Sequence, residues 1–276
     1  MYSAKILKDS IAKCGVRLTT MEVTIPRIVL AEFNTHRVFT RNSASSRAIP
    51  VDKMIKRVTE DCFTPLYWGK NEKGMQATSE LSITEQDEAN EIWLEARDNA
   101  IVSVKKLLKI GVHKQIANRL LEPFMWQTII VSGTYWDNFF NLRMHPDAQP
   151  EIRKPAMMMY DLYNSSIPNA DLSKTFNWHL PLVEDDEIGD LLKSFTIDEI
   201  KKICVGRCAR ISYLTHDGKR DPLADIQLAE RLLFSGHMSP FEHAAISLTS
   251  NIQCGNFNGW KQYRKFLPNE NVFRSN

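Results

Sequence analysis

The residues best suited to chemistry gather in one polar stretch, residues 35–47, which reads Thr-His-Arg-Val-Phe-Thr-Arg-Asn-Ser-Ala-Ser-Ser-Arg. The stretch holds three arginines, a histidine, an asparagine and several hydroxyl groups, and it contains no glycine or proline. Arginine presents a planar fork that fits phosphate and carboxylate, and hydroxyl groups add further donors. The composition therefore indicates either a solvent-exposed loop or a binding site for an anion.

Polar side chains also interrupt apolar segments further along the chain, at Arg119, Asn138 and Arg143. A buried arginine needs a partner, and a structural ion pair would provide one. Together with Arg37 and Arg47, however, these arginines make a supply of guanidinium groups with few acidic residues nearby in the sequence. This excess favours an anionic ligand.

Motifs for several other chemistries are missing from the sequence. No glycine-rich phosphate loop and no Gly-x-Ser-x-Gly elbow occurs, and the five cysteines form no Cys-x-x-Cys pair. His237, Glu242 and His243 lack the spacing of the two-histidine zinc helix, and Pro240 interrupts a helix there. We therefore expect no metal and no nucleophilic serine or cysteine, and we expect side chains to hold any nucleotide.

The overall composition limits the class of protein. The chain has 276 residues with 43% hydrophobic content, and its 35 basic and 33 acidic residues nearly balance. This balance gives no general argument for a nucleic-acid partner, so any anion site must be local. No run is apolar enough to span a membrane, and no signal peptide is visible. We expect a cytoplasmic protein with one domain over 1–276, of which 251–276 forms a C-terminal extension.

Hydrophobic periodicity predicts a mixed chain of strands and helices that positions these residues. The segment 164–195 reads as an irregular connection, and the aromatic and basic residues 259–265 read as a surface helix in preference to an RNA contact. The predicted strands cover 16–25, 128–134 and 244–250. A short helix is predicted after Pro26, and a long one runs from a cap at Thr84 to Gly111. The other predicted helices cover 51–60, 114–121 (ending before Pro123), 135–143, 148–163, 196–206 and 222–234.

Four segments resemble the motifs of flavin-dependent thymidylate synthases. The pattern His36-Arg37-x-x-Thr40-x-Asn42-x-x-Ser45-x-Arg47 is similar to the family signature Arg-His-Arg-x-x-Ser-x-Asn-Glu-x-Ser-x-Arg. The other matching segments are Arg119–Pro123, then Asn138–Arg143 with Ala148–Ile152, and Ala209–Tyr213 with His237–His243.

The order of these segments departs from the family. The Ala-Arg-x-Ser and Pro-Phe-Glu-His elements usually precede the arginine-rich signature, whereas here they come last, so the chain resembles a circular permutation. Strands 244–250 and 16–25 both match the family strand that joins these elements. We therefore expect the two strands to lie close in space, and pairing between them would fit. Termini that lie close together and exposed make such a rearrangement tolerable.

Three positions within the signature region also differ from the family. Thr35 replaces the first arginine, and Ser43 replaces the glutamate. Glu32 stands where the family has a glutamine near the nucleotide phosphate, and a carboxylate there would repel phosphate unless it pairs with Arg47 or Arg119. These changes leave the nucleotide and its binding mode open.

The resemblance implies a fold and a reaction. The fold would be α/β (α+β), with a mixed sheet flanked by helices. The family transfers a one-carbon unit from methylenetetrahydrofolate to C5 of dUMP, with FAD as cofactor and NADPH as reductant, and it uses no enzyme nucleophile. The resemblance also implies a homotetramer whose sites are shared between subunits. The implied ligand is a pyrimidine deoxynucleoside monophosphate, and neither nucleic acid nor a membrane is expected as a partner.

The resemblance also implies roles for individual residues. Arg143 would contact the pyrimidine and act in catalysis with His36, and with His237 near the folate or nicotinamide. The residues implied around the flavin are His36, Arg37, Ser132, Thr134, Asn138, Ser212, Ser239 and Glu242. The residues implied around the nucleotide are Glu32, Thr35, Ser43, Ser45, Ser46, Arg47, Arg119 and Arg143.

Two other functions remain open at this point. The altered Glu32, Thr35 and Ser43 are compatible with a flavin enzyme that has a changed outcome, such as hydroxymethylation of dUMP or modification of dCMP. A relative that binds nucleotide or RNA without catalysis is a third interpretation. The retained His36 and Arg143 argue against this last one.

Overall fold

The central element of the molecule is a four-stranded antiparallel sheet with the strand order β1-β2-β4-β3. Its strands are β1 (Ser3–Ile11), β2 (Arg17–Pro26), β4 (Trp126–Gly133) and β3 (Thr40–Ser43). A computed structural model describes residues 1–213, 220–268 and 270–272, and the side chains of Ser212 and Tyr213 lie outside this description. The fold is thus a mixed α/β one with antiparallel sheets flanked by helices, and this confirms the predicted class.

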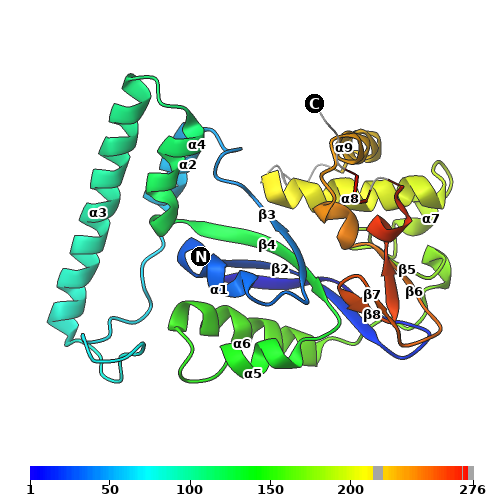
Figure 1. Cartoon of the computed structure of the whole chain (residues 1–276), viewed down its shortest axis with the longest axis horizontal. Helices are drawn as coiled ribbons and strands as arrows, with labels where there is room; N and C mark the ends of the chain where they lie inside the picture. The colour runs from blue at the N-terminus through cyan, green and yellow to red at the C-terminus, as the bar shows by residue number, and fades with distance from the viewer. Residues whose placement is uncertain (214–219, 269, 273–276) are drawn as a thin grey trace.

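One face of the sheet packs on two helices, as Figure 1 shows. The alternation of β2 turns Met21, Val23 and Ile25 toward this face, where all three are fully buried. They pack with β4 against α5 (Asp137–Arg143) and α6 (Pro150–Ser165), which form one hydrophobic cluster with this face. The opposite face of β2 and β4 carries polar side chains, and α8 contacts β4 there.

A helical arm extends from one end of the sheet (Figure 1). It contains α2 (Val51–Glu60), the long α3 (Ile83–Lys109), α4 (Lys114–Ala117) and the 3-10 segment Asn118–Phe124, which enclose their own hydrophobic cluster. Two predictions need correction here. The long helix is capped by Ser82 and not by Thr84, because Ser82 and Glu85 form a reciprocal capping box. The 3-10 segment also continues through Pro123, where the sequence predicted an end.

A second unit covers the polar face of the sheet. Its main helices are α8 (Ile197–Tyr213) and α9 (Pro222–Phe234), and α8 runs beyond its predicted end at Gly206. The segment 164–195 is not irregular throughout, because it contributes strand β5 (Trp178–His179) and helix α7 (Ile188–Leu191). Strands β5, β6 (Ala245–Ser247) and β9 (Trp260–Gln262) form a three-stranded sheet.

The C-terminal residues belong to this second unit. Strand β9 begins in the segment that was predicted as a surface helix, and a 3-10 turn, Tyr263–Phe266, follows it. Strands β7 (Gln253–Cys254) and β8 (Phe257–Asn258) make a small hairpin before it. Trp260 is fully buried, and its indole donates a hydrogen bond to the carbonyl of Val16 at 3.0 Å. The extension therefore packs on the turn between β1 and β2.

The two strands expected to be close do approach each other, but they do not pair. The amide of Lys13 donates to Ser247 Oγ at 2.7 Å, and the amide of Cys14 donates to the Leu248 carbonyl at 3.2 Å. These contacts join the β1–β2 turn to the end of β6. Pairing is excluded because β2 lies between β1 and β4, while β6 lies between β5 and β9. The permuted order of the segments itself stays a prediction.

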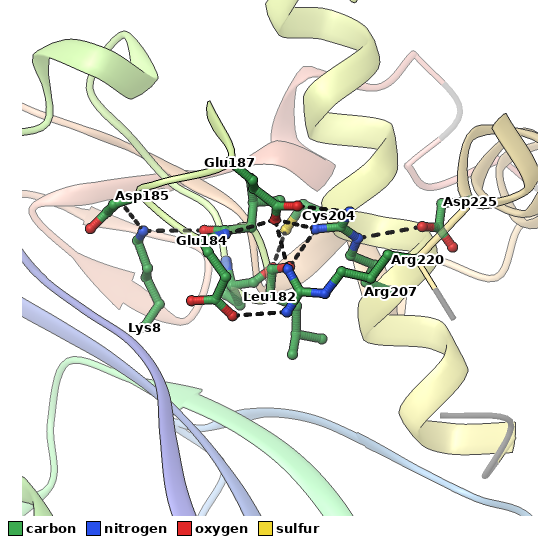
Figure 2. A network of polar contacts seen from close by, with 11 residues as sticks. Lys8, Leu182, Glu184, Asp185, Glu187, Cys204, Arg207, Arg220 and Asp225 are labelled. Carbon is green, nitrogen blue, oxygen red and sulfur yellow. Dashed lines mark hydrogen bonds and ion pairs between the residues drawn. The ribbon is translucent and has the colours of Figure 1, made fainter. Parts of the chain in front are cut away.

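Charged side chains attach α8 and α9 to the rest of this unit, as Figure 2 shows. The guanidinium of Arg207 is 5% exposed and forms ion pairs with Glu187 and Asp225, and it also donates to the carbonyl of Leu182. Arg220 pairs with Glu184 and Glu187 across the same cluster. A buried charge needs such partners to offset its desolvation. The network therefore anchors the two helices.

The remaining elements are short. The 3-10 turn Arg27–Val29 and helix α1 (Leu30–Asn34) follow Pro26 and lead directly into the polar stretch, as predicted. The turn Ser173–Thr175 precedes β5, and the 3-10 turn Ser239–Glu242 precedes β6. In the described part of the chain, no helix is long and apolar enough to cross a membrane.

Candidate anion site around residues 32–47

The polar stretch 35–47 runs along the edge of the central sheet. It leaves α1, forms the edge strand β3 against β4, and ends before α2. Its side chains divide among three surroundings. The first part contacts α5, the middle part lines a cavity beside the second unit, and the last part packs on the helical arm.

His36 and Arg143 meet at the first of these surroundings, although 107 residues separate them in the chain. Arg143 Nε donates to His36 Nε2 at 2.8 Å, and Arg143 Nη2 donates to Thr35 Oγ1 at 3.1 Å and to the Glu32 carbonyl at 3.3 Å. Arg143 also lines a cavity of about 420 Å³ at the end of α5. The structure thus brings together four of the predicted residues, including two of the three expected to act in catalysis.

Burial and neighbouring charge keep His36 neutral. Desolvation lowers the pKa of His36 to about 4, and the nearby cations Arg143 and Arg41 add to this effect. The imidazole packs edge-on against Phe139, with 4.9 Å between the ring centres. Because His36 Nε2 accepts the hydrogen bond from Arg143, its proton must sit on Nδ1.

Arg143 has only neutral acceptors around it. Among the described residues, neither it nor Arg37, Arg41 or Arg47 forms an ion pair. Burial lowers the pKa of Arg41, although the charge of Glu242 opposes this. A partly buried guanidinium without a carboxylate partner matches a site that takes its counter-charge from a ligand.

The middle part of the stretch lines a cavity of about 550 Å³ between β3 and the 3-10 turn Ser239–Glu242. Four predicted residues border it, and Glu242 among them is paired with Arg264. Its donors come from arginine, serine and asparagine side chains, which suit phosphate oxygens. The residues around the cavity are Asn34, Arg37, Phe39, Arg41, Asn42, Ser43, Ile129, Ser239, Glu242 and Asn256.

The last part of the stretch contacts the start of the 3-10 segment in the arm. Asn118 Nδ2 donates to the carbonyl of Ser46 at 2.7 Å. The hydroxyl of Ser46 and the carbonyl oxygen of the Asn118 side chain are buried without a partner. Arg47 is exposed and donates weakly to Ser45 Oγ at 3.5 Å.

The expected neighbours of Glu32 are elsewhere. Arg119 pairs with Glu122 at 2.7 Å, and no ion pair joins Glu32 to Arg47 or Arg119 in the described part of the chain. Glu32 Oε2 is buried and has no hydrogen-bond partner. Neither of the two arginines considered as partners therefore neutralises Glu32 among the described residues.

Several other predicted residues lie outside these cavities. Ser132 is wholly buried within a hydrogen-bond network, so it has no surface with which to touch a ligand. Thr134 accepts a hydrogen bond from the amide of Asn258 at 3.2 Å, and Asn138 is exposed on α5. His237 is exposed beside Ser235, 2.8 Å from its hydroxyl. The side chain of Ser212 lies outside the described residues.

The cavity includes residues to which the sequence assigned no individual role. Composition of the polar stretch was the only signal for Arg41, whereas Asn42 also matches the family signature. Asn256 comes from the C-terminal extension, and its Nδ2 donates to Thr40 Oγ1 at 3.2 Å. No motif around Asn256 would have indicated this position. Among the described residues, no group of three or more potential metal ligands is clustered.

The fold and the site define an α/β protein with a cationic cavity at the edge of an antiparallel sheet. The chain belongs to the family described as thymidylate synthase complementing protein, which matches residues 17–169. This match confirms the family resemblance of the polar stretch and of the segments around Arg119 and Arg143. The segments 209–213 and 237–243 lie outside the matched range.

Solved structures give a fainter likeness. A UMP/dUMP methylase, PolB from Streptomyces cacaoi, bound with 5-Br UMP, is 15% identical with a TM-score of 0.48, and the alignment covers 59% of this chain and 88% of that one. The same enzyme bound with 5-Br dUMP is 13% identical with a TM-score of 0.45, over 59% and 90% of the two chains. A search of curated protein sequences finds no match.

Proposed function

We propose that this protein transfers a one-carbon unit from methylenetetrahydrofolate to C5 of a pyrimidine deoxynucleotide in an FAD-dependent reaction. The proposed substrate is dUMP, the product is dTMP, and NADPH is the reductant. The family match supports this reaction class. The observation that carries the proposal is the position of Arg143, which meets the signature residue His36 and faces no carboxylate among the described residues.

Arg143 would stabilise negative charge on the pyrimidine ring. As C5 becomes nucleophilic, negative charge develops at N3 and O2 of the ring, and a fixed guanidinium near these atoms would lower the energy of that charged state. His36 and Thr35 hold this guanidinium in place by accepting its Nε and Nη2 hydrogens. Because His36 is neutral at physiological pH, it does not compete with the arginine for the anionic ring.

The cavity beside β3 has the donors that FAD requires. Arg37, Arg41 and Ser239 could hold the diphosphate, since guanidinium and hydroxyl groups bind its oxygens. The carboxylate of Glu242 does not repel it strongly, because Arg264 neutralises that charge. Bound FAD, once reduced by NADPH, supplies the hydride for the reaction. The protein residues therefore serve to bind and orient, which fits the lack of a nucleophile motif.

Arg47 and the nearby hydroxyls would bind the phosphate of the nucleotide. Arg47 is exposed and unpaired within the described part of the chain, and Ser45 lies beside it. Ser46 contributes no exposed donor to this site, because its hydroxyl is buried. Arg119 contributes less than the family pattern implies, because Glu122 already neutralises it.

We also propose a homo-oligomer, with a tetramer as the expected state, whose sites combine residues from several copies. The predicted phosphate, pyrimidine and flavin residues occupy three separate surroundings in one chain, so neighbouring copies could complete each site. Light scattering after size-exclusion chromatography tests this, and a monomer at micromolar concentration would contradict it.

All five cysteines are thiols, which suits the reducing cytoplasm.

The first experiment asks whether the protein binds and uses FAD. The purified protein should be yellow, or become yellow on reconstitution with FAD, and anaerobic NADPH should bleach the flavin absorbance. Turnover is then measured with dUMP and methylenetetrahydrofolate, and the product is weighed by mass spectrometry. A colourless protein that cannot be reconstituted would exclude the enzyme and favour a non-catalytic nucleotide-binding relative.

A changed substrate or product is the second candidate function. It is favoured by Thr35, whose hydroxyl accepts a hydrogen bond from Arg143 at a position where the family signature has an arginine. Parallel incubations with dUMP and dCMP distinguish the substrates. The mass of the product separates a methyl from a hydroxymethyl group, because the two differ by one oxygen atom.

A further inference from the structure

A chain of hydrogen bonds crosses the interior between the four-stranded sheet and the unit that covers it. Every strand of the sheet contributes one side chain, and two histidines from the covering unit bridge between them. Five of the six side chains have no exposed surface, and the sixth, Asn42, lines the cavity of about 550 Å³. In spatial order the members are Ser10 of β1, His179 of β5, Thr20 of β2, Ser132 of β4, His243 and Asn42 of β3.

The contacts along this chain are all short. Ser10 Oγ lies 2.9 Å from His179 Nδ1, and His179 Nε2 lies 2.8 Å from Thr20 Oγ1. The two strand hydroxyls, Thr20 Oγ1 and Ser132 Oγ, are 2.6 Å apart. Ser132 Oγ then lies 2.8 Å from His243 Nδ1, and His243 Nε2 lies 2.5 Å from Asn42 Oδ1. Each buried polar atom along this path therefore has a partner.

The side-chain amide of Asn42 determines which atom donates at the cavity end. Asn42 Nδ2 donates to the carbonyl of Cys208 in α8 at 3.2 Å, and a carbonyl can only accept. The Asn42 Oδ1 atom must therefore face His243 and accept from it, so His243 carries a proton on Nε2. Burial lowers the pKa of His243 to about 3, so the ring is neutral and its Nδ1 accepts the Ser132 hydrogen.

The two hydroxyl groups between the histidines have fixed donor roles as well. Ser132 has a single hydrogen, which it gives to His243, so it must accept from Thr20. Thr20 in turn must accept from His179 Nε2. Burial lowers the pKa of His179 well below its usual value, and the charge of Lys8 adds to this. His179 is thus neutral, and its Nδ1 accepts from Ser10. Only one order of donors and acceptors therefore satisfies every hydrogen bond along this path.

We propose that His179 and His243 are positioning residues that, through this one-way chain, hold the Asn42 amide and the edge strand β3 at the wall of the cavity. Strand β3 has four residues and, among the described strands, pairs only with β4, so its backbone contacts alone leave it weakly held. The chain of side-chain hydrogen bonds attaches β3 to β4, β2, β5 and β1 through the interior. The inference concerns the protein without ligand and does not depend on the proposed reaction.

The first test is nuclear magnetic resonance of the full chain labelled with ¹⁵N-histidine. His179 and His243 should both show a protonated Nε2 and an unprotonated Nδ1, and both should remain neutral at pH 5, where an ordinary histidine with a pKa of about 6.5 is charged. His179→Asn and His243→Asn variants assign the signals. A proton on Nδ1 of either ring in the wild-type protein would overturn the donor order.

The second test asks whether breaking the hydrogen-bond chain in its middle loosens the side chain of Asn42 at its end. Ser132→Ala should make hydrogen exchange of the Asn42 side-chain amide at least ten times faster and should give His179 a mixture of both tautomers. Ser132→Thr restores the hydroxyl and should restore both signals. The control is Thr128→Ala, because Thr128 and Thr24 form the same kind of hydroxyl pair between β4 and β2, 2.9 Å apart, with no histidine attached.

Two results with these variants would contradict the inference. If Ser132→Ala leaves the Asn42 exchange rate and the His179 signals as in the wild-type protein, the chain does not position Asn42. If Thr128→Ala changes them equally, general loosening of the sheet accounts for the effect and the inference fails. Should Ser132→Ala not fold, Thr20→Val removes the neighbouring hydroxyl at nearly constant volume, and the same two readouts decide.

Discussion

Two groups of arginines in this molecule have opposite surroundings. Arg207, Arg210 and Arg220 lie around α8 and α9, and each faces at least one carboxylate. Figure 2 shows Arg207 and Arg220 with their partners. Arg143, on α5, donates instead to an imidazole, a hydroxyl and a carbonyl. The ion pairs of the first group hold the helices together. The charge of Arg143 is not neutralised by any carboxylate among the described residues.

The pKa of the acidic partner reflects the same difference. Burial alone would raise the pKa of Glu187, but hydrogen bonds and charge from Arg207, with help from Arg220, lower it below its usual value. Glu32, in the other region, has an oxygen that is buried and unpartnered. A region in which acids and bases are matched is built for stability, whereas unmatched groups of both signs indicate a binding site.

The largest effect is expected from Arg143→Ala. Loss of a fixed cation at a developing charge should lower kcat by about 10²–10³-fold with dUMP as substrate. The free energy of unfolding should change by less than about 1 kcal/mol, because Arg143 makes only neutral contacts. Steady-state kinetics and chemical denaturation measure the two quantities.

The control for this substitution is Arg153→Ala. Arg153 lies on α6 and donates to the carbonyl of Pro146 at 2.8 Å, so it is also a partly exposed arginine with a neutral acceptor. Its loss should alter turnover by less than about twofold, as for an ordinary surface substitution. Unchanged turnover in Arg143→Ala would show that this guanidinium does not contact the pyrimidine.

Arg207→Ala should have the reverse signature. Its removal leaves Glu187 and Asp225 with fewer partners in a buried place, so the free energy of unfolding should fall by about 3 kcal/mol. Lys193→Ala removes an exposed pair with Asp190, in which both side chains are more than 70% exposed, and should cost less than about 0.5 kcal/mol. Equal losses in the two variants would contradict the structural role of the network.

Acid should destabilise the region around His36. Its pKa is about 4 in the folded protein, below the value of about 6.5 for an unfolded histidine. Between these values the unfolded chain binds a proton that the folded chain does not bind, so stability is complete above pH 6.5 and falls as the pH drops to 4, by roughly 3 kcal/mol. Urea denaturation at several pH values measures the slope, and His36→Gln should flatten it.

The surface substitution His145→Gln is the matched control for this pH series. His145 lies just after α5 with a half-exposed ring beside Asp147. The buried histidines His179 and His243 contribute to the same pH range, so His36→Gln reduces the slope without abolishing it. If the slope is identical with and without His36, its folded pKa is not depressed.

Sequence patterns predicted the long elements of the fold well and the short ones badly. Strand β2 alternates over ten residues, and α9 begins with an aspartate cap and a proline at its first turn, so local signals suffice for both. Strand β5 has two residues, and no periodicity exists at that length. Strand β6 lies within the predicted strand 244–250 but has only three residues, which pair with β5 and β9.

The candidate site was predictable to the same mixed extent. The polar stretch and Arg143 stood out by composition and by motif, although nothing local indicates that Arg143 reaches His36. Asn256 and His179 were not predictable, since each lies in a segment without a motif and gains its place from contacts with distant strands. A side chain's role follows from its neighbours in space, and short irregular segments give no information about those.

The smallest expected effect, from Glu32→Gln, distinguishes the two substrates. If the Glu32 carboxylate repels the phosphate of dUMP, an amide should lower KM for dUMP by about fivefold, or about 1 kcal/mol, with little change in kcat. Glu60→Gln, at the exposed end of α2, should leave KM unchanged. A carboxylate can also accept a hydrogen bond from the exocyclic amino group of cytosine. A rise in KM for dCMP, together with turnover of dCMP by the wild-type protein, would therefore mean that the unpartnered oxygen of Glu32 recognises the base, and dUMP would be the wrong substrate.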